Sequence, residues 1–340
     1  MVVKVFVNGF GTIGKRIAMA VMRQDDMKLI GIGKRTPDFK ALVANKLGIP
    51  IFVENEDEAK NFEEKGLKVV GFVEDAIREA DIIVDAAPKG IGKKNKGIYQ
   101  QHGKKAIFQG GEEESVAEVS FVAQVNYDKA LGKDYIRVVS CNTTAISRVI
   151  HTLRSLSPIE KVRVVLVRRA ADPWEVKKGP INAVIPTLKI PSHHAPDAKT
   201  VLGDIDIVSF AVVVPTTIMH LHVLNVKFKE QVSESDIWNA LEEAPRIILV
   251  PTNLKLDSTA ALIELARDLG RPRNDLYEVM VFDKSIRIID GELWMSYAVH
   301  QEAIVVPENI DAIRAAMNLT DNPEESIRKT DTSLGVLKRL

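Results

Sequence analysis

Short hydrophobic runs alternate with longer mixed segments over the first 140 residues of the chain. The runs VVKVFV, MKLIGIG, DIIVDAA, KAIFQ and YIRVVS predict strands at residues 2–7, 27–33, 81–87, 105–109 and 135–140. Helical patterns separate several of these strands, including those at 12–24 and 75–80. Hydrophobic strands that alternate with helices are typical of a parallel sheet covered on both faces. The pattern therefore predicts an α/β domain, with a doubly wound parallel sheet, over residues 1–139.

The pattern changes after residue 140, where strands follow one another with little helix between them. Strands are predicted at 161–169, 207–217, 218–228, 246–250, 276–282, 285–290 and 292–299, and helices at 234–244 and 258–270. Successive strands favour a largely antiparallel sheet, so an α+β catalytic domain is predicted over residues 140–300. A helical pattern at 308–319 predicts that residues 301–340 pack back on the first domain. The polar segment 170–200 is predicted to be a long loop.

Composition narrows the classes of function. The 340 residues include 46 basic and 46 acidic ones, so the formal net charge is zero. Such a protein has no general attraction for nucleic acid or anionic lipid, and we expect neither as a partner. No apolar stretch approaches the ~20 residues that span a bilayer, and the N-terminal residues predict a strand and turn rather than a signal peptide. A single cysteine forms neither an internal disulfide nor a thiolate-rich metal site. The composition predicts a cytoplasmic protein without a metal centre.

Three glycines follow the first predicted strand directly, in the segment NGFGTIGKR. Gly9, Gly11 and Gly14 have GxGxxG spacing and open a predicted helix. Such glycines allow a tight turn, close approach of the backbone to a pyrophosphate and close helix–strand packing. The helix N-terminus then offers N–H groups to the phosphates. Because strands and helices alternate in this part of the chain, the spacing predicts a Rossmann-type dinucleotide site. A glycine-rich turn without a ligand is the alternative.

Two basic residues, Lys34 and Arg35, follow the second predicted strand. An NAD-selective site places Asp or Glu about 20 residues beyond the glycines, where the carboxylate binds the ribose 2′-hydroxyl. A basic pair at this point suits the 2′-phosphate of NADP instead. The pair predicts NADP as the preferred cofactor with NAD also accepted, and a solvated basic turn is the alternative.

The one cysteine, Cys141, lies where a predicted strand gives way to a helical pattern at 142–156. A helix N-terminus lowers the pKa of a thiol, so this position predicts a reactive thiolate where the two domains meet. A buried cysteine that acts as a small hydrophobic residue is the alternative, which the polar SCNTT sequence disfavours.

A nucleophilic thiol needs a base, and histidine is the usual candidate. His220 and His222 in MHLHV would lie on one face of a strand. His193 and His194 form a second pair in the long loop. Arg168 and Arg169 end a predicted strand and face opposite sides, so the sequence leaves open which of them contacts a ligand.

Several motifs, taken in order along the whole chain, carry a family resemblance. They are VNGFGTIGKR, FQGGE, RVVSCNTT, RRAADP, KKGPINA, PSHHAPD, VPTTIMHLH and AVHQEAIVVPENIDAIRA. In this combination they resemble the archaeal-type glyceraldehyde-3-phosphate dehydrogenases. The SCNTT motif differs from the SCTTN of the bacterial and eukaryotic enzymes.

The resemblance implies a function and a role for each motif. The implied reaction is phosphorylating, NAD(P)-dependent oxidation of D-glyceraldehyde 3-phosphate in glycolysis or gluconeogenesis, by a homotetramer that also uses inorganic phosphate. Cys141 would be the nucleophile and His220 its base. The cofactor is expected against Thr12, Ile13, Gly111, Arg169 and Gln301. The substrate is expected with its aldehyde end at Ser140, Cys141 and Asn142, and with its phosphate near His193 and His194.

Two other functions fit parts of the pattern. A cysteine-dependent semialdehyde dehydrogenase, such as aspartate-semialdehyde dehydrogenase, has the same build but needs arginine clamps for carboxylates. A non-catalytic NADP-binding redox sensor would use Cys141 without turnover. A panel of aldehyde substrates separates these functions from the first one.

Overall fold

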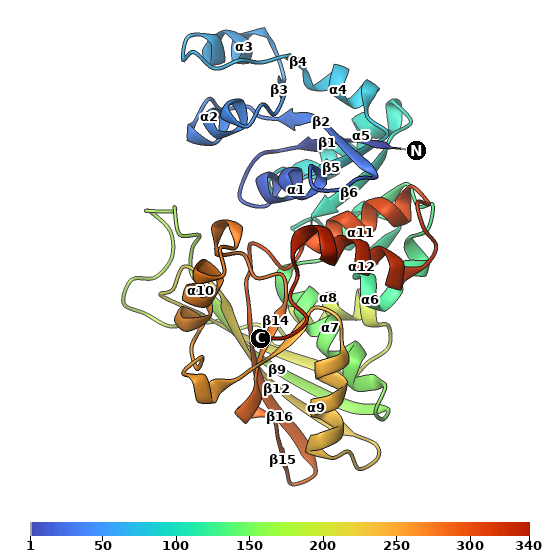
Figure 1. Ribbon diagram of the computed structural model, residues 1–340, viewed down its shortest axis with the longest axis vertical. Coiled ribbons are helices and arrows are strands. Elements are labelled where there is room, and N and C mark those ends of the chain that lie inside the picture. Colours follow the sequence, from blue (N-terminus) through green and yellow to red (C-terminus); the bar gives the residue numbers. More distant parts are fainter. Residues whose placement is uncertain (1, 110) are drawn as a thin grey trace. The chain divides into compact units, whose positions relative to one another are not determined.

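The computed structural model describes residues 2–109 and 111–340. The chain divides into two compact units, each drawn in Figure 1. Unit 1 comprises Met1–Ser140 and Val306–Leu334, and unit 2 comprises Cys141–Val305 and Gly335–Leu340. The predicted division after residue 139 lies one residue before the observed one. The returning segment is shorter than the predicted 301–340, because the residues on either side of Val306–Leu334 are grouped with unit 2.

Unit 1 is built on a parallel sheet with strand order β4-β3-β2-β1-β5-β6-β8-β7. The strands are β1 (Val3–Asn8), β2 (Met27–Gly33), β3 (Ile51–Val53), β4 (Gly71–Phe72), β5 (Ile82–Asp85), β6 (Lys105–Gln109), β7 (Val119–Phe121) and β8 (Tyr135–Val138). The strand order reverses between β1 and β5, which is where doubly wound sheets bind ligands. The predicted Rossmann-type sheet is confirmed.

Helices surround this sheet. They are α1 (Gly14–Val21), α2 (Phe39–Lys46), α3 (Glu56–Glu63), α4 (Val73–Glu79), α5 (Ile91–Gln101), α6 (Ala123–Asn126), α11 (Val306–Ala316) and α12 (Pro323–Leu334). The hydrophobic pattern did not indicate α2 or α3. Phe39, Leu42 and Val43 of α2 are exposed, and Phe62 is the buried residue of α3. Helices that bury so little have no clear apolar stripe.

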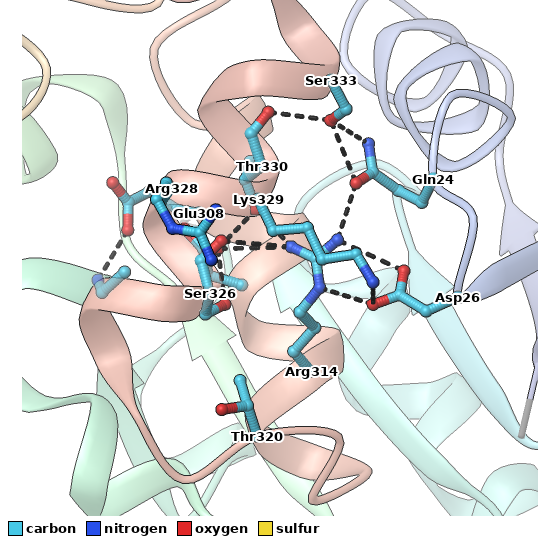
Figure 2. Close-up of polar contacts among 12 residues, drawn as sticks. Gln24, Asp26, Glu308, Arg314, Thr320, Ser326, Arg328, Lys329, Thr330 and Ser333 are labelled. Atoms are coloured by element: carbon cyan, nitrogen blue, oxygen red, sulfur yellow. Dashed lines mark hydrogen bonds and ion pairs between the residues drawn. The ribbon is translucent and has the colours of Figure 1, made fainter.

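A buried arginine, Arg314 of α11, connects the returning helices to the rest of unit 1. Its Nε donates to Asp26 Oδ2 at 2.8 Å and its Nη2 donates to Gln24 Oε1 at 2.7 Å. Its Nη1 donates to Thr330 Oγ1 of α12 at 2.5 Å. Figure 2 shows these side chains converging on the guanidinium group. A buried charge is stable only when it is paired and hydrogen-bonded, so we call this group the Arg314 clamp.

Unit 2 is built on a mixed sheet with strand order β10-β11-β9-β12-β16-β14-β13 and β15 paired to β16. The strands are β9 (Ile159–Arg169), β10 (Ile185–Pro186), β11 (Ile207–Val214), β12 (His220–Phe228), β13 (Ile247–Val250), β14 (Val279–Phe282), β15 (Arg287–Ile289) and β16 (Glu292–Val299). Most neighbours pair antiparallel, as predicted, but β11 runs parallel to β9 and β13 runs parallel to β14. The successive strands β11 and β12 are therefore separated by β9 instead of forming a hairpin.

The helices of unit 2 leave part of the sheet uncovered. They are α7 (Cys141–Arg154), α8 (His194–Leu202), α9 (Glu234–Glu243) and α10 (Thr259–Asp268). In β9, Val164 and Leu166 are fully buried, whereas Val165 between them is exposed, as Phe210 of β11 is. Alternate residues of a strand point to opposite faces, so one face of the sheet is a core and the other is open. Among the helices of residues 2–109 and 111–340, none combines the length and apolarity that crossing a membrane requires.

Candidate active site

The glycine turn of unit 1 has the geometry of a phosphate-binding loop. Gly9 has φ +120°, and a Cβ there would lie 2.7 Å from the carbonyl oxygen of Ala86. A Cβ on Gly14 would overlap the carbonyl oxygen of Gly9, which explains the close approach of α1 to β1. A Cβ on Gly11 would meet nothing within 4 Å. Two glycines are thus required by packing, and the third leaves space beside the backbone.

Helices α1 and α5 follow the adjacent strands β1 and β5, and a carboxylate fills the N-terminus of α5. The backbone N–H groups of Gly90 and Gly92, at the start of α5, donate to Oε1 of Glu112 at 2.7 and 3.1 Å. The N-cap residue of α1, Ile13, makes no side-chain capping hydrogen bond, and the first turn of α1 carries no acidic residue. A helix N-terminus without an acidic residue in its first turn attracts an anion. The N-terminus of α1 and the space beside Gly11 therefore fit a dinucleotide pyrophosphate.

A buried carboxylate that sequence reasoning missed, Asp85, ends β5. The hydroxyl of Tyr99 donates to its Oδ2 at 2.6 Å, and Nδ2 of Asn95 donates to the same atom at 2.8 Å. Nδ2 of Asn8, the residue before the glycine turn, donates to the Tyr99 oxygen at 2.9 Å. Burial raises the pKa of Asp85 despite these bonds. The sequence did show an acidic residue at the end of the predicted strand 81–87. That strand is β5, next to the point where the strand order reverses.

Lys34 and Arg35 lie directly after β2, as predicted, and both are paired with carboxylates. Lys34 Nζ lies 3.0 Å from Asp38 Oδ2, and Arg35 Nε lies 3.1 Å from Glu58 Oε1. The Lys34 side chain is 11% exposed and the Arg35 side chain 76%, so only Arg35 resembles a solvated turn residue. A 2′-phosphate would compete with Asp38 for Lys34.

The other predicted cofactor residues are divided between the units. Thr12 and Ile13 are half-buried in the turn before α1, and Gly111 is exposed after β6. Arg169 and Gln301 belong to unit 2. Gln301 Oε1 accepts the N–H of Met219 at 2.8 Å. Met219, the residue directly before β12, has a left-handed φ of 64°, which is not a strand conformation. That backbone conformation explains why the predicted strand 218–228 begins only at His220.

The cysteine begins a helix, but the pKa of its thiol is not lowered. Cys141 is the first residue of α7 and is partly exposed. Burial raises the pKa of its thiol, while the guanidinium groups of Arg168 and Arg169 and the N–H groups of Asn142 and Cys141 lower it. The net direction is upward. The predicted lowering is wrong because desolvation of the thiolate outweighs the helix terminus and both cations.

His220 begins β12 as a buried, neutral imidazole. Burial lowers its pKa well below the ordinary value, and the charges of His222, Arg168 and Arg169 act in the same direction. Its Nδ1 accepts the backbone N–H of Arg169 at 3.0 Å. The proton of the neutral ring is therefore on Nε2, because Nδ1 is the acceptor. In this tautomer Nε2 is a donor, whereas the predicted base would need a lone pair there.

The next residue on the same face of β12, His222, contacts the residue after the cysteine. Its Nε2 lies 2.8 Å from Oδ1 of Asn142, and Nδ2 of Asn142 lies 3.4 Å from Nε2 of His194. Burial lowers the pKa of His222 to about 3 and that of His194 to about 2. His193 is exposed, although its ring lies 3.9 Å from that of His194. Of the two histidines expected near the substrate phosphate, only His193 is accessible, and Ser140 is half-buried at the end of unit 1.

The two arginines at the end of β9 have different surroundings. The charge of Arg168 acts on the pKa values of Cys141 and of the three buried histidines of this unit's site. The guanidinium group of Arg169 pairs with Asp172, with 2.6 Å between Nη2 and Oδ1. Within the described residues Arg168 forms no ion pair with a carboxylate, so its charge remains available to an anion near the thiol. Over the described ranges, no group of three or more His, Cys, Asp or Glu side chains could hold a metal ion.

Comparison with known proteins agrees with this geometry. Residues 140–269 match the family model described as glyceraldehyde 3-phosphate dehydrogenase, C-terminal domain. The chain is 52% identical over 337 residues to the glyceraldehyde-3-phosphate dehydrogenase of Saccharolobus islandicus, and 53% identical over 337 residues to that of Metallosphaera sedula. Each alignment covers 99% of this chain and 98% of the relative. Neither the semialdehyde dehydrogenase nor the redox-sensor alternative is favoured, and the chain belongs to the glyceraldehyde-3-phosphate dehydrogenase family.

Proposed function

We propose that this chain catalyses the phosphorylating oxidation of D-glyceraldehyde 3-phosphate to 1,3-bisphosphoglycerate, with NADP preferred over NAD. One observation carries the proposal: the single thiol, Cys141, begins α7 beside Arg168 in a chain of this family. Membership of the family supports a nicotinamide cofactor and a place in glycolysis or gluconeogenesis. We also propose a cytoplasmic location.

In the first step the Cys141 thiolate adds to the aldehyde carbon. A C–S bond forms, and the π electrons of the C=O bond move to oxygen. The backbone N–H of Cys141 and the Nε2–H of His220 stabilise this oxyanion, since fixed donors are effective where negative charge develops. In this proposal His220 is a donor rather than a base, because its Nδ1 accepts from Arg169.

The second step converts the thiohemiacetal to an acyl phosphate. A bound nicotinamide supplies the acceptor for the hydride that leaves the former aldehyde carbon. The oxyanion needs no base at this point, because its C=O bond re-forms as the hydride departs and leaves a thioester on Cys141. Inorganic phosphate then attacks the thioester carbon, and the Cys141 thiolate leaves. We propose that Arg168 and the exposed His193 attract the phosphate groups.

The direct test mixes the protein with glyceraldehyde 3-phosphate, phosphate and each cofactor separately, and follows absorbance of the reduced nicotinamide. Sustained turnover with phosphate, and at most one equivalent of reduced cofactor per chain without it, is expected of a phosphorylating enzyme. Turnover with aspartate semialdehyde instead would support the first alternative. Cofactor binding without reduction by any aldehyde would support the redox sensor.

Cofactor preference gives a separate prediction at Lys34. Charge-assisted hydrogen bonds contribute about 1.5–3 kcal/mol each. Loss of one to the 2′-phosphate weakens NADP by roughly 10- to 150-fold. Lys34→Asp should therefore lower kcat/KM for NADP sharply and leave the value for NAD flat or improved. The measurement is kcat/KM for both cofactors at one ionic strength, because salt screens the contact.

The control for Lys34 is Lys46→Asp, which makes the same charge change at an exposed position in α2. Lys46→Asp should change kcat/KM little for either cofactor. Equal losses for the two cofactors in Lys34→Asp would mean that Lys34 supports the turn through Asp38 rather than binding the phosphate. The same comparison in wild-type protein measures the proposed preference for NADP.

We propose that the protein self-associates as a homotetramer. The loop between β9 and β10 exposes Val176 and Ile181 at 91% and 93%, and Leu188 beyond β10 is 89% exposed. The open face of the unit 2 sheet adds Val165 and Phe210. Exposed apolar groups of this extent mark interaction surfaces. Light scattering on the purified protein should give four times the chain mass, and a monomer mass at micromolar concentration would contradict the proposal.

A further inference from the structure

A chain of buried hydrogen bonds runs from the residue after the cysteine into the core of unit 2. Asn142, in the first turn of α7, is 3% exposed and contacts His222 of β12 and His194 of α8. From His194 the contacts continue to Ser192, with 3.0 Å between Nδ1 and Oγ, and from Ser192 to Ser209 of β11, with 2.7 Å between the hydroxyls. His194 and Ser192 are 1% exposed, and Ser209 and His222 are fully buried. We call these five residues the Asn142 network.

Backbone groups at the far end fix the direction of every bond in the network. Ser209 Oγ donates to the carbonyl oxygen of Ser192 at 3.0 Å and accepts the N–H of Ala195 at 3.0 Å. The hydroxyl proton of Ser209 is thus already donated to a carbonyl oxygen. The hydroxyl of Ser192 must therefore be the donor in the contact between the two serines. Ser192 Oγ can then accept from His194, which places the proton of that ring on Nδ1.

The same reasoning orients the amide of Asn142. Nε2 of His194 carries a lone pair, so it accepts from the amide nitrogen of Asn142. The amide oxygen faces the other way and accepts from Nε2–H of His222. Within the described residues, Nδ1 of His222 has no hydrogen-bond partner, and the ring of Tyr297 packs edge-on against the imidazole with 5.0 Å between centroids. Both ends of the Asn142 side chain are held, so it cannot turn toward an oxyanion.

The backbone of Asn142 is the part that acts on the thiol. Its N–H is one of the groups that favour the thiolate of Cys141. We propose that Asn142 is a positioning residue: the Asn142 network fixes the first turn of α7 so that the Asn142 N–H points at the Cys141 sulfur. This inference rests on the proposed role of Cys141 as nucleophile. It replaces the expectation that Asn142 holds the aldehyde end of the substrate.

The network is suited to this task because its members do not change charge near neutral pH. Both histidines remain neutral, since burial and the charge of Arg168 lower the pKa values of His194 and His222 to about 2 and 3. The charged groups that act on the thiol are Arg168 and Arg169. A pH profile of thiol reactivity therefore reports the thiol itself.

The test is the rate of Cys141 alkylation by iodoacetamide as a function of pH. The sulfur displaces iodide and only the thiolate reacts, and the chain has one cysteine. Asn142→Ala should move the inflection upward and slow the reaction at pH 7 by about tenfold, the lower limit for loss of a hydrogen bond to a charged group. Ser209→Ala removes the far anchor and should shift the profile in the same direction by a smaller amount.

Two controls separate positioning from general damage. Asn225→Ala removes an asparagine of β12 outside the network that is 2% exposed and hydrogen-bonded through both its amide oxygen and its amide nitrogen, and it should leave the profile unchanged. His222→Gln keeps a donor for the Asn142 oxygen and should stay near wild type, whereas His222→Leu should behave as Asn142→Ala does. If Asn142→Ala does not fold, the two His222 variants and Ser209→Ala decide the question.

The proposal is overturned if the Asn142→Ala profile superimposes on that of wild type. It is also overturned if Asn225→Ala shifts the profile as much, because the effect would then be loss of packing. Alkylation needs neither aldehyde nor cofactor, so failure of the proposed oxidation would leave this result standing. Conversely, full turnover in wild type together with unshifted variants would reject only the positioning role.

Discussion

Cys141→Ser is expected to abolish nearly all turnover and to leave cofactor binding intact. The serine hydroxyl is not ionised near neutral pH and cannot form the thioester on which phosphate acts. The loss in kcat should be on the order of 10⁴-fold or more, the scale found when a nucleophile is removed from an enzyme. The measurements are kcat for aldehyde oxidation and NADP binding by calorimetry on the same preparation. Substantial residual aldehyde oxidation by Cys141→Ser would contradict the proposed mechanism.

Chemical labelling gives the same residue an independent test. Iodoacetate should inactivate the wild-type enzyme with one label per chain, because no second cysteine exists. Burial raises the thiol pKa, so inactivation should accelerate as the pH rises through and beyond the ordinary thiol range of about 8.5. A rate that is already maximal at pH 6 would show instead that the thiol is ionised there.

His220→Asn should give the second large loss, and the size of the loss reports its role. Removal of one oxyanion donor costs about 10²–10³ in kcat, whereas removal of a general base costs about 10²–10⁴. The two ranges overlap, so His220→Gln is the informative variant, since its amide donates but cannot accept a proton. Partial recovery with glutamine is expected for the donor that the Arg169 N–H enforces.

His222→Asn is the matched control for this experiment, because it alters the neighbouring histidine on the same strand face. His222→Asn should lower kcat much less than His220→Asn does. The reverse order of effects would show that the assignment of His220 is wrong, and no recovery with glutamine would favour the base.

The sequence predicts those parts of the fold that depend on local pattern. The period of hydrophobic residues located the longer strands of both units but not the short strands β3, β4, β7 and β10, and the spacing of Gly9, Gly11 and Gly14 located the glycine turn before α1. These features are encoded by neighbouring residues, so no tertiary knowledge was needed. The 170–200 segment shows the limit of local pattern. Helix α8 begins at His194 inside the predicted loop, because HAPDAKTVL is too short and too polar to show a helical period.

The properties of the site residues depend on tertiary surroundings and were less predictable. The sequence predicted that a helix begins at Cys141, which by itself would lower the pKa of the thiol. It did not predict the desolvation that raises this pKa instead. The pairing of His220 and His222 on one strand face was predicted, yet their hydrogen-bond partners, the Arg169 N–H and Asn142, come from other elements. Lys34 was found as a basic residue after β2, while its ion pair with Asp38 depends on how the chain turns into α2.

The Arg314 clamp sets an order for folding during synthesis. Gln24 and Asp26 are made early, but the arginine that binds them belongs to α11, which is translated after all of Cys141–Val305. At about 5–20 residues per second, a ribosome needs roughly 10 to 40 seconds to pass from the end of the first segment of unit 1 to the end of α12. During that interval the long segment of unit 2, Cys141–Val305, is made without interruption, while unit 1 lacks its last two helices and unit 2 lacks only Gly335–Leu340. Most of unit 2 can therefore fold on the ribosome before unit 1 receives Arg314 and its last two helices.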